Sequence, residues 1–223
     1  MGIIDGIIDM IFPYRNICLF CKEETRPRGK HICPNCMGLI ELANRQVDFR
    51  LPNMNSIYYS ALYNRFMVDK LHAFKFRGEN YLYKPFGEIL LHTIECTELR
   101  DGVDCVAFIP AHRLKEALRG YNQSKLLAEY VARQAGIPLL DNHLFKIRRT
   151  KDQSSLGRRE RMDNLRDCFE GRNVGGFKGK EILLIDDIIT TGTTMEECGK
   201  VLMKNGASRV YGLTLTSSRY LDR

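Results

Sequence analysis

The stretch ILLIDDIITTGTT, residues 182–194, is the part of the chain that decides the fold. Four apolar residues lead directly into two adjacent carboxylates, Asp186 and Asp187, and a cluster of threonine and glycine residues follows shortly after them. A short apolar run bounded by polar and turn-forming residues is typical of a buried strand. We therefore expect a strand over residues 181–185 that ends at the two aspartates, and then a loop that turns into a helix.

The neighbouring segments alternate between strand and helix patterns. Strands are expected in SIYYSALYNR (56–65), DCVAFIP (104–110), HLFKIRRT (143–150) and RVYGLTLTSS (209–218). Helical periodicity runs from residue 66 to about residue 93 with a break at KFRGEN (75–80), and it returns in SKLLAEYVARQAG (124–136) and TTMEECGKVLMKNGA (193–207). Strands that alternate with helices predict an α/β fold with a doubly wound, mostly parallel sheet.

The paired carboxylates predict a binding site at the rim of this sheet. In an open α/β sheet, ligands bind beyond the carboxyl ends of the strands, which is where Asp186 and Asp187 are expected. Carboxylates accept hydrogen bonds from vicinal hydroxyl groups, and a glycine-containing loop at a helix N-terminus binds phosphate. The residues suited to the phosphate are Thr190, Thr191, Gly192, Thr193 and Thr194. The motif therefore predicts a ribose 5-phosphate site, whereas the alternative of a polar turn with two solvated acids explains neither the pairing nor the hydroxyl density.

Two C-x-x-C pairs near the N-terminus predict a metal site. Cys18 and Cys21 form one pair, Cys33 and Cys36 form the other, and eleven residues separate the pairs. Four thiolates close a tetrahedral shell around Zn²⁺ and leave no open position, so the zinc would be structural. His31 is a weaker alternative ligand and is more simply read as a surface histidine. Two disulfides are the other alternative, and the remaining cysteines oppose it because they are scattered singly, which indicates a reducing compartment.

The composition indicates a globular protein that favours anionic partners. Of the 223 residues, 44% are hydrophobic and 27% are charged, and the formal net charge is +7. The first thirteen residues, MGIIDGIIDMIFP, lack a basic leader region and are too short to span a bilayer. Their isoleucine spacing predicts a short amphipathic helix that packs on the body of the protein. We expect a cytoplasmic protein without membrane insertion.

Several motifs resemble those of known families. The stretch 182–194 resembles the phosphoribosyl-pyrophosphate (PRPP) motif of type I phosphoribosyltransferases, and the chain as a whole resembles the ComF family of bacterial competence proteins. The further motifs that carry this resemblance are FPYRNICLFC, LHAFKFRGE, IPAHRLKEALRGYNQSKLLA and TKDQSSLGRRERMDNLRDCF. The resemblance implies two domains: an N-terminal helix with a zinc ribbon over residues 1–50, and a phosphoribosyltransferase-like domain over residues 51–223.

The resemblance also implies roles for particular residues. Asp186 and Asp187 would bind the ribose hydroxyls of PRPP, with Mg²⁺ bridging the ligand's oxygens, and no protein nucleophile is required. Pyrophosphate would bind the turn formed by Pro110, Arg113, Arg119 and Gln123. The basic segment 146–161 would form a lid over PRPP, and its Arg149 would act with the two aspartates in catalysis by neutralising the leaving group.

Two classes of function follow from these motifs. The first is a Mg²⁺-dependent phosphoribosyltransferase with an unidentified acceptor. The second is a DNA-uptake protein that binds single-stranded DNA, acts with other competence proteins, and keeps the PRPP site as a sensor or relic. The residues expected to contact nucleic acid are Tyr58, Phe76, Arg148, Arg149 and Lys151. The alternative is that the aromatic residues between positions 58 and 76 belong to the core, and the exposure of their rings discriminates between the two.

Overall fold

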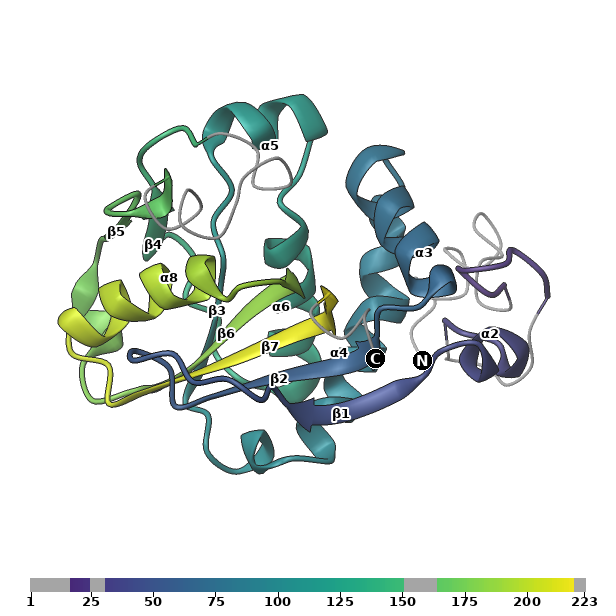
Figure 1. Ribbon diagram of the computed structural model, residues 1–223, viewed down its shortest axis with the longest axis horizontal. Helices are drawn as coiled ribbons and strands as arrows, with labels where there is room; N and C mark the ends of the chain where they lie inside the picture. Colours follow the sequence, from purple (N-terminus) through teal and green to yellow (C-terminus); the bar gives the residue numbers. More distant parts are fainter. Residues whose placement is uncertain (1–16, 25–30, 151–163, 219–223) are drawn as a thin grey trace, which may run out of the picture.

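The computed structural model describes residues 17–24, 31–150 and 164–218, and it contains a five-stranded sheet in the order β1-β2-β7-β6-β3. Figure 1 shows how the strands lie across the centre of the molecule. Their bounds are β1 (Leu42–Gln46), β2 (Ser56–Leu62), β3 (Cys105–Phe108), β6 (Glu181–Ile189) and β7 (Arg209–Ser217). Only the β1 and β2 pairing is antiparallel, so the mostly parallel α/β sheet expected from the sequence is confirmed.

Strand β6 lies between β7 and β3, and both of its faces are buried. Leu183 and Ile185 pack into the core on one face of the sheet, and Ile182 and Leu184 pack into the core on the other. A parallel strand that is covered on both faces reads as a continuous apolar run rather than as an alternating pattern. This explains why residues 182–185 carry no polar side chain.

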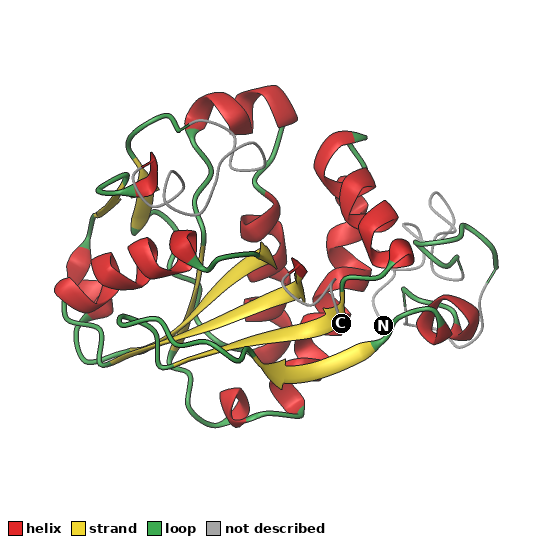
Figure 2. Cartoon of the chain, in the orientation of Figure 1, coloured by secondary structure: helices red, strands yellow, loops and turns green. Residues whose placement is uncertain are grey.

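Helices cover both faces of the sheet (Figures 1 and 2). The helices α3 (Arg65–Phe76), α4 (Tyr83–Glu95) and α6 (Gln123–Ala135) contribute to the core on one face. Helix α8 (Thr193–Lys204) packs on the other face, together with a separate antiparallel pair of strands, β4 (Leu144–Lys146) and β5 (Phe169–Gly171). Short 3-10 turns occur at Asn80–Leu82, Glu98–Arg100 and Val174–Phe177. The sheet is therefore doubly wound, as expected.

The cysteine-rich segment packs directly on α3 and α4. It contains the short helix α2 (Pro34–Gly38), and the ring of Phe20 lies 5.5 Å from that of Phe66 and 5.4 Å from that of Phe86. Nδ1 of His31 lies 2.6 Å from Oε1 of Glu88 on α4. The segment thus shares its core with the helices beside the sheet, and β1 adds a strand to the sheet itself. A division into domains at residue 50 stays a prediction.

Three expectations for individual elements differ from the structure. Strand β6 does not end at residue 185 but continues to Ile189, because β7 pairs with it along its whole length. The basic turn after Pro110 contains a helix, α5 (Arg113–Arg119), which ends at Gly120 in the left-handed region with φ of +83°. Only Leu144–Lys146 of the strand expected over residues 143–150 is extended. The expected N-terminal helix and most of the lid lie outside the described residues.

Candidate functional site

The two aspartates lie where one neighbour of β6 has ended and the other continues. The ladder between β3 and β6 stops at Phe108 and Ile185, and the backbone N–H of Ile109 donates to the carbonyl of Ile185 at 3.0 Å. On the other side, β7 pairs with β6 as far as Ile189. Asp186 and Asp187 therefore lie at a free edge within the sheet, the position at which open α/β sheets bind ligands.

The two carboxylates have different surroundings. Oδ1 of Asp186 accepts hydrogen bonds from the hydroxyl of Ser124 at 2.8 Å and from the backbone N–H of Asp187 at 2.9 Å. Burial, and next the neighbouring charge of Asp187, raise the pKa of Asp186 to about 7. Asp187 instead forms an ion pair, with its Oδ2 2.8 Å from Nζ of Lys75. The pair thus combines one easily protonated acid with one acid held by a counter-ion.

The loop after β6 has the geometry of an anion site. Gly192 has φ of +78° and precedes the first residue of α8, where Thr193 and Thr194 present backbone N–H groups at the helix N-terminus. The hydroxyls of Thr191 and Thr193 lie 2.8 Å apart. A small recess lies along this loop and is lined by the side of Asp186 as well as by Thr190 and Gly192. The structure therefore brings the predicted phosphate residues together beside an aspartate.

A cleft of about 820 Å³ separates the end of α3 from α5. Its described lining contains four cationic side chains and no carboxylate: Lys75, Lys115, Arg119 and Arg149. Three exposed apolar side chains also line it: Phe76, Leu114 and Leu118. Lys75 connects the cleft with the aspartate pair, because it lines the cleft and binds Asp187. The cleft therefore offers positive charge and apolar surface next to the carboxylates.

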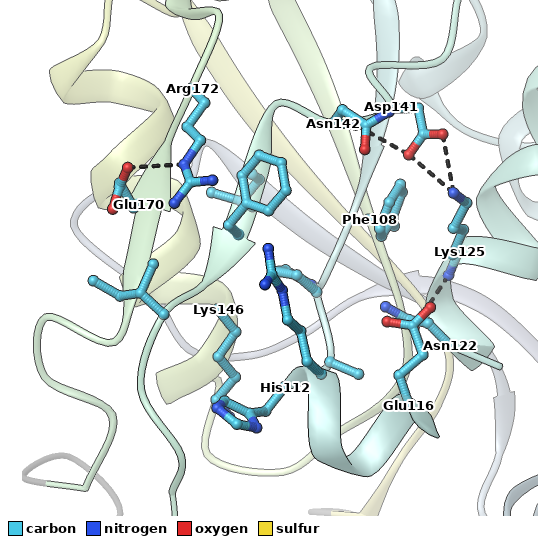
Figure 3. A pocket seen from close by; sticks show the side chains of 16 residues that line it. Phe108, His112, Glu116, Asn122, Lys125, Asp141, Asn142, Lys146, Glu170 and Arg172 are labelled. Atoms are coloured by element: carbon cyan, nitrogen blue, oxygen red, sulfur yellow. Dashed lines mark hydrogen bonds and ion pairs between the residues drawn. The ribbon is translucent and has the colours of Figure 1, made fainter. Parts of the chain in front are cut away.

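The residues predicted to bind pyrophosphate are divided between two cavities. Arg119 lines the cleft, and its Nη1 donates to Oε1 of Gln123 at 2.7 Å. Pro110 and Arg113 instead line a second cavity of about 510 Å³ on the other side of α5. Figure 3 shows this second cavity, with the ion pairs of Lys125 with Asp141 and of Arg172 with Glu170 on either side of it. The structure thus does not place Arg113 with Arg119.

Arg148 and Arg149, which precede the undescribed residues 151–163, make different contacts. Arg149 lines the cleft, in keeping with a role beside the aspartates. Arg148 instead donates from Nη2 to the carbonyl of Arg166 at 2.8 Å and from Nε to the Cys168 sulfur at 3.2 Å. Arg148 therefore contacts the segment at residues 166–168 and not the cleft. Lys151 lies outside the described residues.

The aromatic residues predicted to contact nucleic acid do not form one surface. Phe76 is 64% exposed and lines the cleft, whereas Tyr59 and Phe74 are fully buried in the core. Tyr58 is half-buried, and its hydroxyl donates to Glu98 at 3.0 Å in the turn after α4. Tyr58 does not line the cleft beside Phe76, and a role of Tyr58 in contacting nucleic acid stays a prediction.

The four cysteines of the two pairs form a cluster that fits a metal ion. The sulfur atoms of Cys18, Cys21, Cys33 and Cys36 all lie within 4.8 Å of one another. Although burial opposes ionisation, hydrogen bonds from backbone N–H groups lower the pKa of Cys18 to about 7. Four converging sulfurs with N–H donors suit a tetrahedral ion such as zinc. His31 is not part of the cluster, because its ring is bonded to Glu88.

Two residues of the site were not predicted to contact the aspartates. Lys75 lies in the motif LHAFKFRGE, near the end of α3, and Ser124 lies in the motif IPAHRLKEALRGYNQSKLLA, near the start of α6. Both contact the aspartates only because α3 and α6 pack beside the end of β6. The family resemblance marks both segments, but no pattern in the sequence pairs these two residues with the aspartates.

Comparison with known proteins shows the family to which the chain belongs. Residues 122–217 match the family model described as phosphoribosyl transferase domain, so the α/β sheet belongs to a domain of the phosphoribosyltransferase fold. Competence protein ComFC of Streptococcus pneumoniae is 32% identical over 203 residues, which cover 89% of this chain and 86% of the relative. ComFC of Bacillus subtilis is 29% identical, with 94% and 87% covered, and competence protein F of Haemophilus influenzae is 26% identical, with 91% and 84% covered. The chain belongs to the ComF family of competence proteins. No helix among the described residues is long and apolar enough to cross a membrane.

Proposed function

We propose that this protein binds PRPP together with Mg²⁺ in the cytoplasm and serves DNA uptake as a phosphoribosyltransferase with an unidentified acceptor. The observation that carries the proposal is the aspartate pair at the free edge of β6, followed at once by the loop of Thr190–Thr194 and faced by a cationic cleft. The names of the relatives support the role in competence.

Each part of PRPP has a counterpart in the site. The ribose hydroxyls would donate to Asp186 and Asp187, and the 5-phosphate would accept hydrogen bonds from the N-terminus of α8. The pyrophosphate would enter the cleft, where Arg119 and Arg149 stabilise the charge that develops on the leaving group. The residues near the ligand supply binding and orientation, and no side chain is required to form a covalent bond.

The carboxylate pair also fits Mg²⁺. Carboxylate oxygens are ligands that this ion prefers. Asp187 also lies next to the cleft proposed for pyrophosphate, because its Oδ2 contacts Nζ of Lys75, which lines that cleft. When bound, Mg²⁺ would neutralise pyrophosphate charge. The cysteine cluster would hold zinc as a structural ion, since all four of its ligands are protein sulfurs.

A titration with PRPP, followed by an assay for turnover, tests this function. Calorimetry with PRPP and Mg²⁺ should show binding that Asp186→Asn with Asp187→Asn weakens, because each lost charged acceptor contributes roughly 1.5–3 kcal/mol. Pyrophosphate release should then depend on one member of a panel of bases and nucleic acids. Binding that is unchanged in the double variant would mean that the motif is not a working site.

The second candidate function is direct binding of single-stranded DNA, with the PRPP site as a sensor or relic. The exposed ring of Phe76 among four cations is the observation that favours it, because bases stack on aromatic rings while cations hold phosphates. Binding of PRPP without release of pyrophosphate in the presence of any acceptor, together with binding of DNA, would favour this function. Displacement of DNA by PRPP would indicate that both occupy the cleft.

A further inference from the structure

Lys75, near the end of α3, forms an ion pair with Asp187, the carboxylate that the proposed function assigns to a ribose hydroxyl. Its Nζ lies 2.8 Å from Oδ2 of Asp187, and the two side chains are only 21% and 10% exposed. Ion pairs with little exposure are weakly screened by water and salt. A ribose hydroxyl that approaches Oδ2 of Asp187 therefore competes with the ammonium group of Lys75 for that oxygen.

The backbone at Lys75 is fixed, so any exchange involves its side chain. The preceding residue, Phe74, is fully buried, and its carbonyl accepts a hydrogen bond from the hydroxyl of Tyr121 at 2.5 Å. The rings of Phe74 and Phe86 lie 5.5 Å apart in the core. The side-chain amide of Gln123 on α6 donates to the same carbonyl at 3.4 Å. The end of α3 is thus held against α4 and α6, while the flexible four-carbon chain of the lysine can reorient.

The charges in the cleft determine when reorientation of the Lys75 side chain is favourable. Lys75 lines the cleft, and the other charged side chains of its described lining are Lys115, Arg119 and Arg149, all cationic. An ammonium group that leaves Asp187 therefore moves toward like charges, which is unfavourable unless an anion lies among them. Pyrophosphate supplies that anion, whereas ribose 5-phosphate places its single phosphate in the loop at α8 and leaves the cleft without one.

We propose that Lys75 is a displaceable counter-ion that makes ribose binding at Asp187 conditional on a pyrophosphate in the cleft. This inference rests on the proposed function and adds a specificity-determining residue to it. Without ligand, the lysine neutralises Asp187. With PRPP, its ammonium group turns to the pyrophosphate and leaves the carboxylate for the sugar hydroxyls. The exchange selects PRPP over ribose 5-phosphate.

Calorimetric titrations with PRPP and with ribose 5-phosphate, each with Mg²⁺, test the inference. In Lys75→Met, PRPP affinity should fall about tenfold or more, because a charged contact to the pyrophosphate is lost. Ribose 5-phosphate affinity should rise, because Asp187 is no longer occupied. Lys75→Arg should keep the wild-type preference. Lys70→Met is the matched control, since Lys70 lies on the same helix, contacts Asp69 at 3.5 Å, and does not line the cleft.

Opposite shifts for the two ligands distinguish this mechanism from a structural role, which would weaken both. Parallel losses, or no change in Lys75→Met, would overturn the inference. Failure of the wild-type protein to bind PRPP would instead overturn the proposed function. Because Lys75→Met leaves a nearly buried carboxylate unpaired, the double variant Lys75→Met with Asp187→Asn is measured as well. It removes both charges, and an undiminished preference for PRPP in that variant would also refute the inference.

Discussion

Gly192 shapes the turn between β6 and α8, and its replacement by alanine should destabilise the protein and weaken PRPP binding together. Its φ of +78° lies in the left-handed region, where a Cβ atom costs about 1–2 kcal/mol. The new Cβ would also lie 2.7 Å from Cδ1 of Leu51 and 3.0 Å from Cε2 of Phe49. Overpacking of this kind costs about 1–3 kcal/mol. Both neighbours are the ends of side chains that can shift, so we expect a total in the lower half of the summed range, about 2–3.5 kcal/mol.

Urea unfolding of Gly192→Ala and of a matched control, Gly136→Ala, measures this cost. Gly136 has φ of +69°, but nothing lies within 4 Å of the position of its Cβ, so its replacement should cost only about 1–2 kcal/mol for backbone strain. PRPP affinity should fall only in Gly192→Ala, because the shifted turn moves the N–H groups of Thr193 and Thr194. Equal destabilisation of the two variants would refute the packing argument, and an unchanged PRPP affinity in Gly192→Ala would refute the assignment of the loop to the phosphate.

Three more predictions concern the metal, a titrating acid and DNA. Cys33→Ser should lose a bound zinc of about one per chain, which elemental analysis detects, whereas Cys96→Ser should retain it because that exposed thiol is outside the cluster. The pKa of Asp186 is raised to about 7 in the folded protein, so its contribution to stability is present at low pH and is lost as the pH rises through about 7. Asp186→Asn should therefore gain stability relative to wild type in urea melts as the pH rises, and a constant difference would contradict the raised pKa. If single-stranded DNA binds the cleft, Phe76→Ala should weaken its binding by roughly 1–3 kcal/mol in a fluorescence titration at fixed salt, and Tyr58→Ala should not.

The sheet could be read from the sequence because its strands carry strong local signals. The run at residues 182–185 is apolar throughout, and the helix that ends at Gly136 shows both periodicity and a terminating glycine, which has φ of +69°. The length of β6 was harder to predict. Asp186 and Asp187 look like the start of a loop, yet the strand continues past them, because β7 offers backbone partners as far as Ser217. A tertiary partner thus overrode a local turn signal.

The site was predictable only where its residues are adjacent in sequence. The basic stretch after Pro110 was expected to be a turn, but it contains good helix formers between a cap at His112 and Gly120, and it forms α5. Residues six apart on a helix point about 120° apart, and Arg113 and Arg119 accordingly line different cavities. The ion pair of Lys75 with Asp187 was also beyond a sequence pattern, since it depends on how α3 docks.

Side-chain packing along α3 links the cysteine-rich segment to the candidate site. Phe20 of that segment packs against Phe66 in the first turn of α3 and against Phe86 on α4, and Phe86 in turn contacts Phe74 in the last turn of α3. This chain of rings holds both ends of the helix. Lys75 follows Phe74 directly, so the position of its ammonium group at Asp187 depends on the packing of the ribbon as well as on α6. A metal held by the four cysteines would therefore also stabilise the wall of the cleft, which would give a physical reason for joining the cysteine-rich segment to a phosphoribosyltransferase fold in one chain.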